Sequence, residues 1–252
     1  MNMEVIILGS GTGVPSLKRG GPGLVVKTGR DTILFDSGPG TLNRLLKVKI
    51  DYRKVDHIFY SHFHPDHVCE LVPFLFACKY NETPRTKLLK ISGPPGLENL
   101  YLGLLEVYGE WITPERYKVE IIELKENLYR GNKWTVSAKP MKHVEPCLGY
   151  KMETNDGTTM VYSGDTDYCP EIVELARNAD LLVLECSFPE KYRMKGHLTP
   201  LLAGRIGRES RCKHMVLTHM YPVCERYNIK AKCKKEYKGK LTVARDLMRF
   251  VI

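Results

Sequence analysis

The chain has 252 residues, 43% of them hydrophobic, and its 38 Lys and Arg exceed its 29 Asp and Glu, giving a formal net charge of +9. This length suits one domain, residues 1–252, with a sizeable core, and no apolar run approaches the roughly 20 residues that span a bilayer, so we expect no membrane partner. The positive charge favours an anionic partner without identifying it as nucleic acid.

The first half of the chain predicts short strands alternating with helices. Apolar segments bounded by glycines and charged residues indicate strands at 5–8, 23–27, 32–36, 55–60 and 88–92. Helices are expected at 41–46, 70–78 and 95–111. The last of these places apolar side chains at helical spacing, so it could wall a cleft, form a homodimer surface or simply pack on the core.

The second half repeats this pattern. Strands are predicted at 119–124, 134–138, 148–154, 159–162, 181–185, 215–218, 241–244 and 248–252. Helices are predicted at 170–177 and at 200–209, the latter with Thr199 as N-cap and Pro200 in its first turn. The lysine-rich segment 230–240 predicts a solvated helix and turn, with an RNA-contacting patch as the alternative. No linker or low-complexity segment marks a domain boundary.

Cysteine usage and the N-terminus predict a cytoplasmic protein. The first residues pass directly into an apolar strand, without the basic region and separate apolar region of an export signal. The eight cysteines form no CxxC pair, so we expect reduced thiols. A structural zinc site built from them is the less favoured alternative.

The segment 61–67, Ser-His-Phe-His-Pro-Asp-His, is the strongest functional signal. It places three histidines and one carboxylate within six residues, directly after an apolar run. A metal needs several such side chains converging on one point, and a loop at a strand end can aim them inward. His143, Asp165 and His219 also follow predicted strands, where sheet-based active sites gather. The sequence therefore predicts a metal site.

The order HxHxDH followed by His, Asp and His resembles the metallo-β-lactamase superfamily along the whole chain. The resemblance implies an α/β fold, a single-domain four-layered αβ/βα sandwich with a two-metal site at one edge. It assigns one metal to His62, His64 and His143, the other to Asp66, His67 and His219, and a bridging role to Asp165. Zn²⁺ is the default for this all-nitrogen and oxygen set, with Mn²⁺ or Fe left open. His57 and His214 match no ligand position and are expected to be structural.

Two further segments resemble the ribonuclease Z branch and related phosphodiesterases. Gly196-His197-Leu198-Thr199 is similar to a Gly-His-Ser-Thr motif, which implies that His197 acts as general acid. Leu184-Glu185-Cys186-Ser187 is similar to a His-Glu-Ala-Thr motif, which implies that Glu185 orients that imidazole. A backbone-bonded loop histidine is the alternative for His197. The resemblance further implies a metal-bridging hydroxide as nucleophile, with Asp66 as both ligand and proton acceptor.

The glycine-rich segment 9–13 is a poor match to a dinucleotide-binding motif. Its spacing is GxGxG, and Pro15 interrupts the helix that should follow. It resembles instead the N-terminal loop of the ribonuclease Z branch, which borders the active site.

The sequence leaves the substrate open. His143 and Asp165 are only 22 positions apart, enough for one hairpin but not for the arm that grips tRNA in ribonuclease Z. We expect a dinuclear metal-dependent hydrolase, a phosphodiesterase acting on a small phosphodiester or an RNA 3′ end. A lactone or thioester hydrolase and a non-catalytic zinc-binding scaffold are the alternatives.

Overall fold

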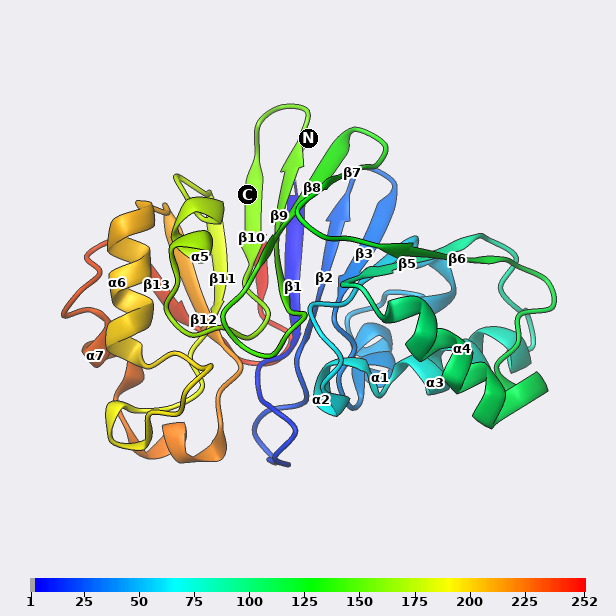
Figure 1. The fold of residues 1–252 in the computed structure, drawn as a ribbon, viewed down its shortest axis with the longest axis horizontal. Helices are drawn as coiled ribbons and strands as arrows, with labels where there is room; N and C mark the ends of the chain where they lie inside the picture. The colour runs from blue at the N-terminus through cyan, green and yellow to red at the C-terminus, as the bar shows by residue number, and fades with distance from the viewer. Residues whose placement is uncertain (1–2) are drawn as a thin grey trace.

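Apolar strands assemble into two seven-stranded sheets in the computed structural model, which describes residues 3–252 (Figure 1). The first sheet has the order β14-β1-β2-β3-β4-β5-β6. Its strands are β1 (Met3–Gly9), β2 (Gly23–Thr28), β3 (Asp31–Phe35), β4 (His57–Phe59), β5 (Leu89–Gly93), β6 (Val119–Glu123) and β14 (Arg249–Val251). Neighbours from β14 to β3 are antiparallel, and those from β3 to β6 are parallel.

The second sheet repeats this design with the order β13-β12-β11-β10-β9-β8-β7. Its strands are β7 (Leu128–Arg130), β8 (Trp134–Pro140), β9 (Leu148–Thr154), β10 (Thr159–Tyr162), β11 (Leu181–Glu185), β12 (His214–Thr218) and β13 (Lys240–Val243). Neighbours from β7 to β10 are antiparallel, and those from β10 to β13 are parallel. The predicted repetition of two halves is therefore present.

Helices cover the outer face of each sheet, as Figure 1 shows. On the first sheet lie α1 (Thr41–Lys47), α2 (Pro65–Val68), α3 (Leu71–Tyr80) and α4 (Leu97–Tyr108). On the second lie α5 (Pro170–Leu175), α6 (Pro200–Ser210) and α7 (Ile229–Cys233). Four short 3₁₀ turns are η1 (Tyr52–Lys54), η2 (Gly109–Trp111), η3 (Glu190–Tyr192) and η4 (Pro222–Arg226). No helix within residues 3–252 combines the length and apolarity that crossing a membrane requires.

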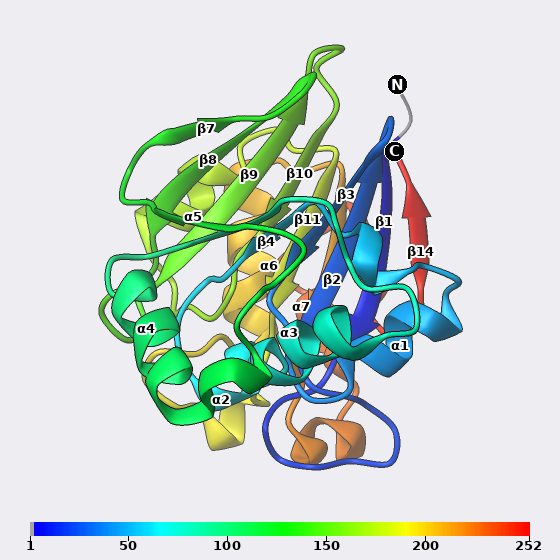
Figure 2. The same cartoon turned by 90° about the vertical axis from the view of Figure 1, so that its right-hand side faces the viewer.

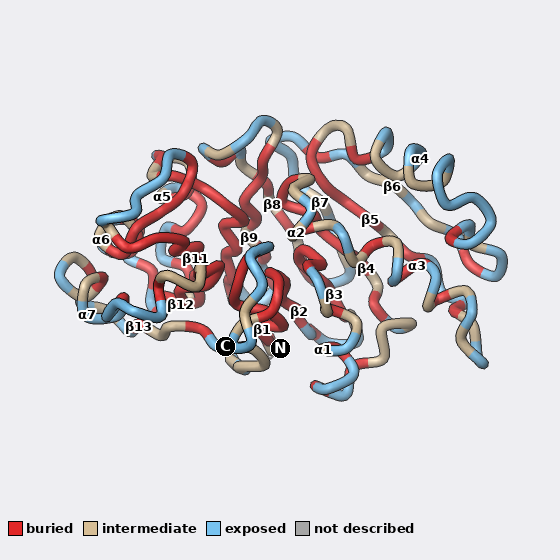
Figure 3. Tube along the Cα trace, turned by 90° about the horizontal axis from the view of Figure 1, so that it is seen from below, coloured by how far each residue is buried: buried red, intermediate tan, exposed pale blue. Residues whose placement is uncertain are grey.

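Three hydrophobic clusters hold the layers together. Successive side chains of a strand point to opposite faces, so Val5 of β1 joins the cluster between the sheets while Ile6 joins the cluster under α1, α3 and α4. In β11, Val183 packs between the sheets while Leu182 faces α5 and α6. The strands therefore form a buried middle and the helices an exposed rim (Figure 3). This is the predicted αβ/βα sandwich.

Some elements differ from the sequence prediction. The segment 55–60 contributes only the three-residue strand β4, because the chain turns at once into the histidine loop. Strand β7 was not expected, since a three-residue edge strand has too few residues to show a pattern. Thr199 is the N-cap of α6, but its side chain forms no capping hydrogen bond. The helix expected at 95–111 is α4, followed by the 3₁₀ turn η2. Partly buried Tyr101 and Leu104 of α4 pack against the core of the first sheet.

The final strand β14 joins the first sheet rather than extending the second, and it pairs with β1. Near the opposite end of β1, the loop leading to β2 lies against η4 (Figure 2), where Arg19 Nε pairs with Glu225 Oε1 at 2.7 Å. These two contacts join the first residues of the described chain to its last quarter. The candidate ligands lie in loops at the strand ends, on the side where the loop after β1 meets η4.

Candidate metal centre

Loops at the ends of four strands bring the candidate ligands together. His62 and His64 lie in the loop after β4, and Pro65 then begins α2, which carries Asp66 and His67. His143 follows β8, Asp165 follows β10 and His219 follows β12. His219 has φ of 55°, a conformation that non-glycine residues rarely adopt and that often marks functional sites.

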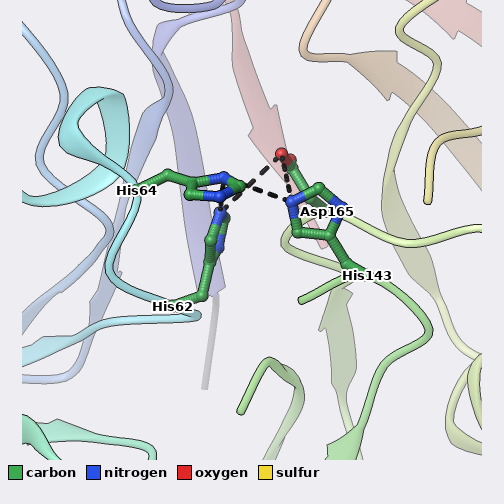
Figure 4. Close-up of side chains that lie close together, drawn as sticks. All are labelled: His62, His64, His143 and Asp165. Atoms are coloured by element: carbon green, nitrogen blue, oxygen red, sulfur yellow. Dashed lines mark hydrogen bonds and ion pairs between the residues drawn. The ribbon is translucent and has the colours of Figure 1, made fainter. Parts of the chain in front are cut away.

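One cluster consists of His62, His64, His143 and Asp165, whose ligand atoms all lie within 4.8 Å of one another (Figure 4). His64 Nδ1 is 3.0 Å from His62 Nε2 and 3.2 Å from His143 Nε2. His143 Nε2 is 3.7 Å from Asp165 Oδ2. Ligand atoms around a tetrahedral ion with bonds of about 2.0 Å are about 3.3 Å apart, so this spacing fits a metal ion.

A second cluster consists of Asp66, His67 and His219. His67 Nε2 is 3.3 Å from His219 Nε2, and His219 Nε2 is 3.5 Å from Asp66 Oδ2. Asp165 also approaches this cluster, with its Oδ2 3.5 Å from His67 Nε2. The Asp165 carboxylate therefore stands between the two groups of histidines.

The surroundings of the Asp165 carboxylate show whether this ligand set fits a metal. Its Oδ1 is buried and accepts no hydrogen bond from any described residue. A buried carboxylate oxygen without a donor is costly unless a cation satisfies it. Burial raises the pKa of the Asp165 carboxyl, but His219 and His67 outweigh burial and hold that pKa well below its usual value. The carboxylate is therefore ionised, and the donor set fits divalent cations.

The imidazoles are oriented so that one nitrogen of each faces the clusters. Nδ1 of His62 contacts Ser61 Oγ at 3.0 Å, and Nδ1 of His143 contacts the Gly196 carbonyl oxygen at 2.9 Å. Nδ1 of His67 donates to Asp36 Oδ2 at 2.7 Å, and Nδ1 of His219 lies 3.0 Å from Ser187 Oγ. In these four rings Nε2 faces the clusters, whereas His64 presents its Nδ1 to the first cluster. One nitrogen held by a neighbour and the other free for the ion is the arrangement of metal-binding histidines.

Neutral imidazole is the form that binds a metal. Burial, followed by the neighbouring His67, lowers the pKa of His62 to about 2. Burial also lowers the pKa of His143. The rings of His62 and His143 are therefore neutral at physiological pH.

Asp36 is a site residue that sequence reasoning missed. Besides His67, its carboxylate accepts from Ser61 N at 2.7 Å, from Ser61 Oγ at 2.8 Å and from the Tyr162 hydroxyl at 2.7 Å. It thus orients His67 of the second cluster directly and His62 of the first through Ser61. Asp36 lies at the end of β3, which is parallel to β4, so it is next to the loop that carries His62 and His64. This position at a strand end is the signal that could have identified it.

His197 and Glu185 form a second arrangement beside the clusters. His197 Nδ1 lies 2.9 Å from Glu185 Oε1, and this fully buried carboxylate also accepts from the backbone of Thr166 and Leu198. Burial lowers the pKa of His197, but the hydrogen bond to Glu185 outweighs it, so the pKa is raised overall. His197 Nδ1 is also 4.0 Å from Asp165 Oδ2, yet its closer partner is Glu185.

The sequence of residues 31–220 matches the family model of the β-lactamase superfamily domain. The chain belongs to this superfamily. Ribonuclease BN of Enterobacter sp. (strain 638) is 28% identical over 276 residues, covering 86% of this chain and 89% of the relative. Ribonuclease Z of Streptococcus suis (strain 98HAH33) is 29% identical over 281 residues, covering 87% and 90%.

Solved structures show the same fold. The metallo-β-lactamase fold protein YhfI from Bacillus subtilis superposes with a TM-score of 0.87 at 24% identity, covering 100% of this chain and 99% of that one. Human tRNase Z, short form, superposes with a TM-score of 0.81 at 24% identity, covering 98% of each chain. The metallo-β-lactamase fold expected from the sequence is therefore confirmed.

All nine site residues predicted from the sequence lie within this network of the superfamily fold. The two histidines expected to be structural lie outside the clusters. His57 Nε2 is 2.7 Å from Ser92 Oγ inside the first sheet, and His214 Nε2 is 2.9 Å from Thr242 Oγ1 in the second. The glycine-rich loop borders the centre, because Gly13 N donates to Asp66 Oδ2 at 2.8 Å.

Proposed function

We propose that the chain is a dinuclear metal-dependent phosphodiesterase that cleaves a small phosphodiester or the 3′ end of an RNA. The observation that carries this proposal is the pair of ligand clusters sharing Asp165, beside a histidine held by a buried glutamate. Relatives named ribonuclease Z and ribonuclease BN, similar over most of their length, support the same reaction class. Residues 1–252 form one hydrolase domain in this proposal, since both halves contribute to one site.

The proposal assigns each candidate ligand residue to a metal. One metal would be held by His62, His64 and His143 and the other by Asp66, His67 and His219, with Asp165 available to both. Nitrogen and oxygen donors suit Zn²⁺ and also Mn²⁺ or Fe, and Zn²⁺ is the default because it is redox-silent. When bound, the ions would stabilise charge on a phosphoryl oxygen and bring the pKa of a water toward neutrality.

The remaining residues would handle protons. Asp66 is partly exposed and would accept a proton from the attacking water through its carboxylate. His197 would donate a proton from Nε2 to the leaving oxygen, since its Nδ1 is taken by Glu185. Glu185 is a positioning residue that fixes the tautomer of that ring.

A cavity of about 390 Å³ beside His143 gives room for the group attached to the phosphate. Three prolines line it, and its two lysines, Lys125 and Lys142, are matched by two carboxylates, Glu126 and Glu145. A cytoplasmic location remains part of the proposal, resting on the cysteine pattern of the sequence. A homodimer is a further element of it, resting on the exposed Tyr108 and Trp111 after the packed part of α4.

The test is a comparison of substrates with the metal-replete protein. We expect turnover of bis-p-nitrophenyl phosphate and of at least one natural diester, chosen from cyclic nucleotides and a precursor tRNA. An acyl-lactone serves as the competing substrate. Hydrolysis of the lactone with no cleavage of any diester would contradict the proposal, and so would a replete protein that binds metal but hydrolyses nothing.

A further inference from the structure

A second hollow lies on the second half of the molecule, away from the metal ligands. It has a volume of about 490 Å³. One wall is formed by residues 189–191 and Pro200, and the other by residues 227–229, 231, 232 and 235. We call it the lysine groove. In Figure 1 its walls are the yellow segment before α6 and the orange segment leading into α7.

The lysine groove carries a net positive charge, because three lysines line it against one glutamate. Lys191, Lys232 and Lys235 line it, and none of them lies within 4.0 Å of a carboxylate oxygen in residues 3–252. The acidic residue in the wall is Glu190, whose Oε1 accepts a hydrogen bond from Leu201 N at 2.9 Å. That carboxylate is therefore engaged at the start of α6. The groove thus offers cations to an anionic ligand.

Aromatic rings stand at the same place. Tyr192 and Tyr227 are 42% and 41% exposed, and their ring centroids are 6.0 Å apart in an edge-to-face arrangement. Lys191 Nζ lies 5.9 Å from the centre of the Tyr192 ring. Exposed rings beside unpaired lysines are the combination by which proteins bind single-stranded nucleic acid, because rings stack on bases while cations follow the backbone.

The groove and the metal centre share the segment between β11 and α6. Within it, Ser187 Oγ lies 3.0 Å from His219 Nδ1, and the Phe188 ring lies edge-to-face against His197. The groove wall begins at the next residue, Pro189. The same segment returns at His197, three residues before Pro200 of the wall. A strand of nucleic acid held in the groove would therefore run alongside the centre.

We propose that the lysine groove binds the single-stranded RNA segment that continues from the scissile phosphate. This rests on the proposed function, because it states where such a substrate is held. Unstacked bases can reach exposed rings, whereas the bases of a duplex are covered by their neighbours. The groove would then provide binding energy that the absent tRNA-gripping arm cannot, while a small diester would not need it.

The experiment compares two triple variants of the full-length metal-replete protein. One replaces the groove lysines, K191A/K232A/K235A, and the other replaces three exposed lysines on the first half, K47A/K54A/K118A. Binding of a fluorescein-labelled single-stranded RNA with an uncleavable backbone is followed by anisotropy from 50 to 300 mM salt. Turnover of bis-p-nitrophenyl phosphate is measured on the same samples and reports the metal centre alone.

We expect the groove variant to bind RNA about 10- to 100-fold more weakly at low salt. Its salt slope should fall by about 2, since each phosphate contact contributes about 0.7 for a single strand. The control triple should lose less than about threefold, and bis-p-nitrophenyl phosphate turnover should stay within about twofold for both. A further variant, Tyr227→Ala, should weaken RNA binding by about tenfold with an unchanged salt slope.

Three outcomes would overturn the inference. They are equal losses in the two triples, wild-type binding by the groove variant, and equal or tighter binding of a duplex of the same length. Failure of the proposed function appears separately, as absence of diester turnover by the wild type whatever the groove binds.

Discussion

The two halves of the chain build the metal centre in different ways. The first half supplies four candidate ligands from one stretch, residues 62–67, whereas the second supplies the candidates His143, Asp165 and His219 from three separate loops. A contiguous loop fixes its side chains by local geometry. Asp165 and His219 depend on the pairing of β10, β11 and β12, which are parallel and therefore end at the same edge, whereas His143 follows β8 on the antiparallel side of the same sheet. The first half is thus a local motif, and the second is a product of sheet register.

The sharpest test of this comparison is to remove the second-half side chain that approaches both clusters. Asp165→Asn should reduce the metal content from about two ions per chain toward one, because its carboxylate faces both clusters. Diesterase turnover should fall by about 10³-fold or more. Elemental analysis and bis-p-nitrophenyl phosphate assays provide the two measurements. Two tightly held ions in this variant would show that the two clusters bind metal independently of Asp165.

The next variant tests a second-half residue that we place outside the ligand set. His197→Ala should leave the metal content unchanged and lower turnover by about 10²–10⁴-fold, the scale of a general acid. The loss should be largest for a diester with a poor leaving group, which needs protonation most. Glu185→Gln should show a smaller loss with the same dependence on the leaving group. An equal loss for good and poor leaving groups would assign His197 another role.

A third variant tests Asp36, a first-half residue that orients ligand side chains of the histidine loop. It lies outside the ligand loop yet contacts His67 and, through Ser61, His62. Asp36→Asn should weaken metal affinity by about 10- to 100-fold, the usual effect of altering a group that orients a ligand. Competition with a chelator measures this affinity. Tyr162→Phe removes one of the hydrogen bonds to Asp36 and is the matched control, with a loss of less than about tenfold.

The smallest effect concerns a histidine that is not a ligand. Burial, followed by the charge of Lys90, lowers the pKa of His57 to about 3, so this ring stays neutral when folded. Between the unfolded pKa of about 6.5 and the folded pKa of about 3, the unfolded state binds one more proton than the folded state. As the pH falls through this window, the free energy of unfolding therefore decreases by up to about 1.4 kcal/mol per pH unit.

His57→Gln should remove this dependence while keeping a polar partner for Ser92. Between pH 7 and pH 5, urea unfolding of the wild type should therefore lose about 2 kcal/mol more than unfolding of the variant. Parallel pH profiles for the two proteins would mean that His57 is protonated without cost in the folded state.

Sequence predicted the motif and the layers better than the connections between them. The apolar runs that contain Val5 and Ile6, and Leu182 and Val183, predicted β1 and β11, and the structure buries these neighbouring side chains on opposite faces of each sheet. The roles of Asp36 and Ser187 depend on strand ends that meet only after folding. No local pattern gives their contacts, and for Asp36 the available signal was its position at the end of a predicted strand.

The pairing of β14 with β1 has a topological consequence. Met3 and Ile252 exchange two backbone hydrogen bonds, at 3.1 and 3.0 Å, so the described backbone forms a nearly closed circuit. The turn at 155–157, which joins β9 to β10, lies at the end of the molecule away from α2 (Figure 1). A circular permutant opened at this turn would keep the sheet neighbours of each ligand-bearing strand. The candidate metal centre is therefore specified by which strand ends are adjacent, and not by the order in which the chain visits them.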